Sequence, residues 1–81
     1  MKRTLNELDA GQSATVTRIA GRGAIRQRLM DMGVMRGTQV RVERRAPLGD
    51  PIQIAIKGYY LAIRSAEAQF IEIENAPNVS G

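Results

Sequence analysis

The chain has 81 residues and contains neither cysteine nor histidine. These totals exclude a fold held by disulfides, a zinc site built from nitrogen and sulfur ligands, and acid–base catalysis by histidine. The formal net charge is +4, and the arginines concentrate between residues 18 and 45, which indicates either an anionic partner or a solvated basic face.

The N-terminal segment predicts a short helical turn followed by a strand. Thr4 and Glu7 have the spacing of a capping box, so residues 4–8 are expected to form one helical turn. This turn is expected to cover one end of a barrel. Residues 13–19 alternate and are rich in β-branched side chains, which is typical of a strand.

The next element is predicted to be a helix over residues 24–32. Ile25, Leu29 and Met32 stand at i, i+4 and i+7, so all three are expected on one buried face. Gly33 follows at the position where a glycine accepts the positive φ that ends a helix.

The remainder of the chain predicts four further strands and one short helix. A turn-rich loop, residues 46–51, separates the first two of these strands, and Ser65 is expected to cap the helix 66–70. The strands cover residues 39–45, 52–56, 59–63 and 71–74.

Five short strands in a chain of this length indicate a mainly β fold, closed into a small five-stranded barrel. We expect one domain over residues 1–75 and a flexible tail over 76–81.

There is no apolar run of the roughly 20 residues that a membrane span needs, and no leader of signal-peptide type, so a cytoplasmic location is expected. The predicted core consists of Val16, Ile25, Leu29, Val40, Val42, Ile52, Ile54, Ile56, Leu61, Ile63, Ile71 and Ile73.

Glycine and proline positions carry a family resemblance. In chain order come Leu-Asp-Ala-Gly at 8–11, Arg-Leu-Met-Asp-Met-Gly-Val at 28–34, Gly-Thr at 37–38 and Arg-Arg-Ala-Pro-Leu-Gly-Asp-Pro at 44–51. Together they resemble the ferrous iron transport protein A (FeoA) family over roughly residues 4–74. Ala10 departs from the proline that the family often has there.

The resemblance implies an SH3-like barrel with a helical insertion. It also implies a non-enzymatic accessory protein in the cytosol, without a cofactor, whose partner is a FeoB-type ferrous iron permease with a G-protein domain. The oligomeric state is left open between a monomer and a weak dimer.

One candidate docking edge lies along the predicted helix 24–32. Arg22 and Arg26 precede or enter the helix, where cations oppose its dipole, so their presence is not explained by helix stability. With Met30 and Met35 they would offer a cationic and apolar edge to a partner. The alternative is that the arginines are solvated and the methionines pack.

The second candidate is the loop 46–51, represented by Pro47, Leu48, Gly49 and Asp50. Prolines near both ends restrict the loop and lower the entropy lost on binding. The alternative is that Gly49 and Asp50 only make the turn between two strands.

Other functions fit the residues less well. The alternative function is a small basic barrel that binds nucleic acid. The chain has only three aromatic residues and therefore offers little surface on which bases could stack. We expect no nucleic-acid partner. No nucleophile–base pair or phosphate loop can be assembled, so an enzyme is not expected. Thioethers suit ferrous iron poorly, and the scattered carboxylates allow only a weak surface contact with a metal ion.

Overall fold

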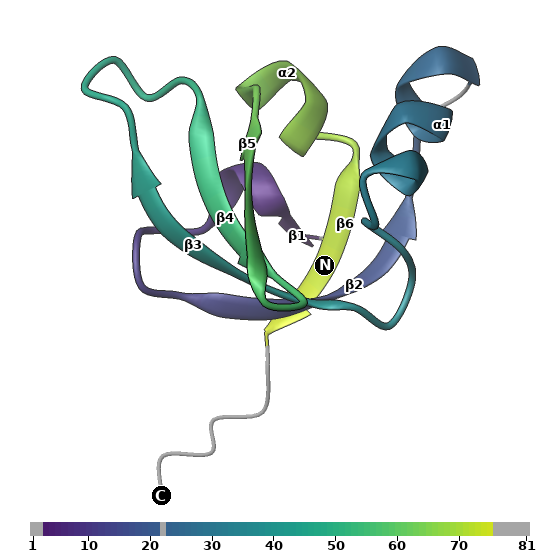
Figure 1. Ribbon diagram of the computed structural model, residues 1–81, viewed down its shortest axis with the longest axis horizontal. Helices are drawn as coiled ribbons and strands as arrows, with labels where there is room; N and C mark the ends of the chain where they lie inside the picture. Colours follow the sequence, from purple (N-terminus) through teal and green to yellow (C-terminus); the bar gives the residue numbers. More distant parts are fainter. Residues whose placement is uncertain (1–2, 22, 76–81) are drawn as a thin grey trace, which may run out of the picture.

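The computed structural model describes residues 3–21 and 23–75. Arg22 and the tail predicted over 76–81 lie outside the described residues. Figure 1 shows the chain as one strongly bent antiparallel sheet with α1 and α2 toward one end. Its elements are β1 (Arg3–Thr4), η1 (Leu5–Glu7), β2 (Ser13–Ile19), α1 (Gly23–Asp31), β3 (Gln39–Arg45), β4 (Ile52–Ile56), β5 (Tyr59–Ile63), α2 (Ser65–Ala68) and β6 (Ile71–Asn75).

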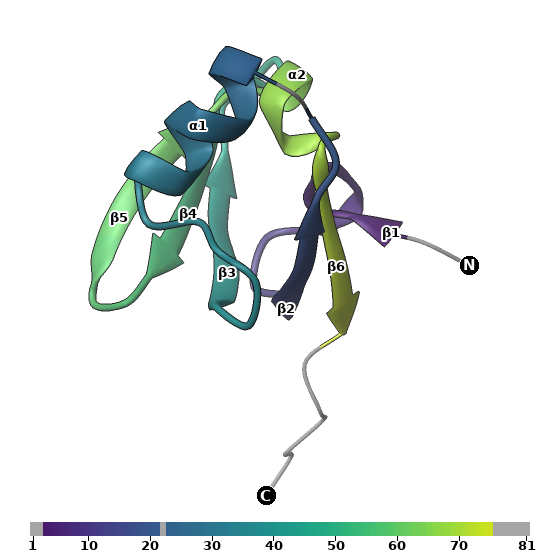
Figure 2. The same ribbon diagram turned by 90° about the vertical axis from the view of Figure 1, so that its right-hand side faces the viewer.

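The sheet follows the order β1-β6-β2-β3-β4-β5 in the described part of the chain. All five predicted strands are confirmed within one residue, and β1 adds a sixth, which pairs Arg3 with Ile73. Register shifts between Val16 and Arg18 in β2, and between Val42 and Arg44 in β3, interrupt the two longest strands. Such bulges increase the local twist, which is how a few short strands curl around one core (Figure 2).

The N-terminal turn is confirmed as a single turn of 3-10 helix. The backbone amide of Thr4 donates a hydrogen bond to Glu7 Oε2 at 2.8 Å, as a capping box requires. Leu5 and Leu8 are completely buried in the same cluster as the strand residues. The turn therefore contributes two side chains to the core in addition to covering it.

The predicted core is confirmed except at Ile25. The alternating residues of β2, β3, β4 and β6 are buried, and Leu61 packs partly buried against them. Ile25 is 37% exposed, which makes its assignment to the core wrong. The remaining buried apolar residues, which the predicted set omitted, are Leu5, Leu8, Ala14, Val34 and Ala68.

The exposure of Ile25 follows from how α1 meets the barrel. Leu29 is the only residue of α1 that is buried, while Met32, just beyond its end, is half-buried. The backbone amide of Gly33 bonds to Met30 O at 2.9 Å and that of Val34 to Leu29 O at 3.0 Å. This pair of bonds is a Schellman motif, and it brings the buried Val34 beside Leu29. The helix is thus fixed at its C-terminal end, and its first turn stands away from the core.

The second helix differs from the prediction in its bounds and in its cap. It covers Ser65–Ala68 instead of 66–70, and Arg64, not Ser65, occupies the cap position. Ser65 is drawn into the first turn because its amide donates to Asp50 Oδ1 at 2.9 Å and its hydroxyl donates to Gly49 O at 3.3 Å. No described helix is long and apolar enough to cross a membrane.

Candidate docking surface

An open groove of about 970 Å³ lies between β2 and α1. The end of β2 and the following residues form one wall, and α1 with the connection to β3 forms the other. Its lining consists of Thr17, Arg18, Ile19, Ala20, Gly21, Gly23, Arg26, Met30, Met35 and Arg36.

Three residues of the predicted docking edge meet in this groove. Arg26 and Met30 lie one helical turn apart on α1, and Met35 joins them from the connection to β3. Sequence reasoning missed Arg18 and Arg36. Strict alternation would place Arg18 on the same inward face as Val16, and only the bulge between these two residues directs Arg18 outward. Nothing in the sequence indicated this bulge, or that β2 and α1 would enclose a groove.

The groove carries more positive charge than its neighbouring carboxylates balance. Arg18 lies 3.9 Å from Glu72, a long contact at a side chain that is largely exposed. Arg26 and Arg36 have no carboxylate within 4.0 Å among residues 3–21 and 23–75. The wall of α1 therefore offers cationic groups next to two thioethers.

The predicted recognition loop is divided between two roles. Gly49 and Asp50 bind Ser65 through the contacts described above, so they hold the loop against α2. Pro47 is exposed, and Leu48 is 96% exposed, the most exposed large apolar side chain among the described residues. The structure thus leaves Pro47 and Leu48 available at the tip of an anchored loop.

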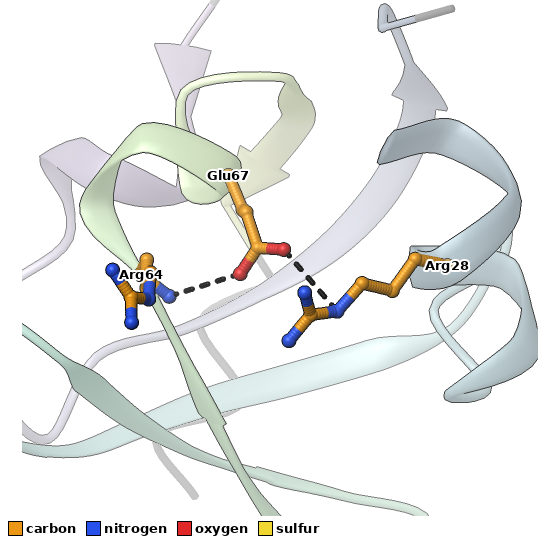
Figure 3. A network of polar contacts seen from close by, with 3 residues as sticks. All are labelled: Arg28, Arg64 and Glu67. Atoms are coloured by element: carbon orange, nitrogen blue, oxygen red, sulfur yellow. Dashed lines mark hydrogen bonds and ion pairs between the residues drawn. The ribbon is translucent and has the colours of Figure 1, made fainter. Parts of the chain in front are cut away.

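The buried carboxylate of Glu67 links α2 to α1, the helix that forms one wall of the groove. Glu67 of α2 is 8% exposed, accepts a hydrogen bond from the Arg64 amide at 3.3 Å, and lies 3.5 Å from Arg28 Nε of α1 (Figure 3). Figure 1 shows α2 between α1 and the β3–β4 loop, at one end of the barrel. Glu67 therefore contacts α1, which carries Arg26 and Met30, through one ion pair whose arginine is mostly exposed to solvent.

We expect Glu67→Ala to lower the free energy of unfolding by about 1–2 kcal/mol, because it leaves the cap amide of Arg64 without its side-chain acceptor. Arg28→Ala is expected to cost less than about 0.5 kcal/mol, since the guanidinium is mostly exposed and screened by solvent. Urea denaturation followed by circular dichroism measures both. Equal losses in the two variants would show that the ion pair, rather than the cap, is the main contribution.

The described residues include no group of three or more carboxylates that could hold a metal ion. The acidic side chains act instead in hydrogen bonds and ion pairs, as shown by Glu7, Asp50 and Glu67.

Comparison with known proteins agrees with the fold and the sequence motifs. The FeoA domain family matches residues 3–75. The "Fe(2+) transport protein A/Fe(2+) transporter FeoB fusion protein" of Porphyromonas gingivalis is 39% identical over 70 residues, which cover 86% of this chain but only 8% of the fusion protein.

Two solved structures show the same barrel. The FeoA-like protein of Clostridium acetobutylicum has a TM-score of 0.89 and 35% identity, with 99% of this chain and 93% of that chain covered. FeoA of Stenotrophomonas maltophilia complexed with zinc, described as a prokaryotic SH3 domain protein, has a TM-score of 0.79 and 29% identity, with 89% of each chain covered. The predicted SH3-like fold is confirmed, and this chain belongs to the FeoA family.

Proposed function

We propose that this chain is a non-enzymatic accessory protein of ferrous iron uptake, which docks on the cytosolic side of a FeoB-type permease and modulates transport. The observation that carries the proposal is the Porphyromonas gingivalis fusion protein, in which a homologous segment and a FeoB transporter share one polypeptide. Covalent linkage keeps two partners at high effective concentration, so such a fusion is compatible with a contact that is weak between separate chains.

Two surfaces are suited to this contact. The groove between β2 and α1 offers arginines and methionines, a combination that is enriched in protein–protein interfaces. The anchored loop offers Leu48 at its tip, where binding would bury an apolar side chain at little further cost in loop entropy.

Leu48→Asp is expected to weaken binding to the permease about tenfold or more, because it places a charge where an apolar side chain would be buried. Stability should change by less than about 0.5 kcal/mol, since Leu48 makes almost no contacts in the free protein. Tyr60→Asp is the matched control, because Tyr60 is also exposed, at 64%, but lies on β5.

Binding is measured with the whole permease, purified in detergent and immobilised, in the presence of GDP or of a non-hydrolysable GTP analogue. The proposal predicts retention of the wild-type chain and of the Tyr60→Asp variant. Failure to bind the whole permease in both nucleotide states, together with unchanged ferrous iron uptake in cells that lack this protein, would refute the proposed function.

A further inference from the structure

Strand β2 loses one of its two neighbours halfway along its length. On the β3 side, the last backbone bonds run from the Val16 amide to Thr38 O at 2.8 Å and from the Gly37 amide to Val16 O at 2.7 Å. On the opposite side, β6 remains paired with β2 up to Ile19. Within residues 3–21 and 23–75, no strand pairs with β2 beyond Val16 on the β3 side. The second half of β2 is therefore an open edge.

The orientation of Ile19 follows from the neighbouring bonds. The Ala20 amide donates to Phe70 O at 2.7 Å, so Ala20 faces β6. The amide and carbonyl groups of one strand residue point to the same edge, and those of the next residue point to the opposite edge. The amide and carbonyl groups of Ile19 therefore point away from β6. No hydrogen bond of these two groups across the open edge occurs among the described residues. Such an edge is a template for pairing with another strand.

The groove that borders this edge has a definite chemistry. Ile19 lines it from β2, while Arg26 and Met30 line it from α1 and Arg36 from the connection to β3. The two arginines have no carboxylate within 4.0 Å in the described structure. A strand added here would lie next to these arginines and next to thioether side chains of the same wall. This combination complements an acidic segment that also carries apolar residues.

We propose that an extended acidic peptide segment of the partner pairs through its backbone with the open edge of β2 at Ile19. Its carboxylates contact Arg26 and Arg36, and its alternating apolar side chains pack on Met30 and Met35. This mode of recognition takes affinity from main-chain hydrogen bonds and selectivity from alternate side chains. Insofar as the segment belongs to a permease, the inference rests on the proposed function.

The test uses the full chain and three fluorescein-labelled peptides of about eight residues, short enough for a single added strand. One alternates glutamate and valine, the second alternates lysine and valine, and the third repeats the first with alternate backbone amides N-methylated. Fluorescence anisotropy should show binding of the first peptide and about tenfold weaker binding of the other two, because one loses charge complementarity and the other loses backbone donors. Nitrogen-15 spectra should place the largest shift at the Ile19 amide.

Arg26→Glu is expected to weaken binding of the glutamate–valine peptide about tenfold, whereas Arg44→Glu makes the same charge change on β3, outside the groove, and should leave binding within about twofold. Both side chains are exposed, so neither variant should affect folding. Equal binding of the N-methylated peptide, equal effects of the two variants, or no binding of the first peptide would overturn the inference. So would tighter binding of an oligothymidylate than of the peptide at the same surface.

The two proposals fail separately. Permease binding that is insensitive to Arg26→Glu would leave the proposed function intact and overturn strand addition in the groove. Peptide binding with the predicted selectivity, but without any binding of the permease, would support the groove inference and refute the permease as partner.

Discussion

Leu29→Ala is expected to lower the free energy of unfolding by about 3 kcal/mol, within the range for a leucine truncated in a packed core. The loss should be large because Leu29 is the only buried residue of α1 and packs in the cluster that includes Val34. In a small domain whose total stability is on the order of 5–15 kcal/mol, this is a substantial fraction. Urea denaturation followed by circular dichroism gives the value.

Ile25→Ala is the matched control for Leu29→Ala. It removes an aliphatic side chain of nearly the same size from the same helix, but from a position that is exposed, so we expect a loss below about 1 kcal/mol. Because α1 carries Arg26 and Met30, Leu29→Ala should also weaken binding in the groove. Equal losses of unfolding free energy in Leu29→Ala and Ile25→Ala would contradict the conclusion that α1 is fixed to the barrel through Leu29.

Gly33→Ala is expected to destabilise the protein by about 2 kcal/mol through two separate costs. Gly33 has φ +95°, a backbone region that costs a residue with Cβ about 1 kcal/mol or more. An added Cβ would also meet the hydroxyl oxygen of Tyr59, which donates a hydrogen bond to Met32 O at 2.7 Å. Displacing that hydroxyl would lose a further contribution of about 1 kcal/mol.

A double-mutant cycle separates these two costs. Tyr59→Phe alone should lose about 1 kcal/mol, the contribution of the hydrogen bond. In the Tyr59→Phe background, Gly33→Ala should cost only the backbone term of about 1 kcal/mol, since the hydroxyl that it would displace is gone. Strict additivity of the two single changes would show that Gly33 and the tyrosine hydroxyl do not interact.

The strands could be predicted because their signal is local. In β4, residues 52–56 alternate strictly, and every apolar residue at an inward position is buried. The two-residue strand β1 is too short to show any alternation, and it exists because β6 supplies its partner. The misassignment of Ile25 has a similar cause: helical spacing identifies a face, but not how far that face extends over the barrel.

The candidate site was less accessible to sequence reasoning than the fold. Arg26 and Met30 could be associated because they are one turn apart on a helix, whereas Arg18 joins them only through the packing of α1 beside β2. In the loop, Gly49 and Asp50 could be recognised as turn residues, but their contacts with Ser65 depend on a helix that begins 15 residues later. The open edge of β2 depends on where β3 diverges, which no local pattern encodes.

The position of β6 determines where the barrel can tolerate an attachment. The C-terminal end of β6 lies at the opposite end of the barrel from α2 and the β3–β4 loop (Figure 1). A fluorescent protein, a surface-immobilisation tag or a tethered permease domain joined after Asn75 would therefore leave the barrel at the end away from the β3–β4 loop and keep Pro47 and Leu48 accessible.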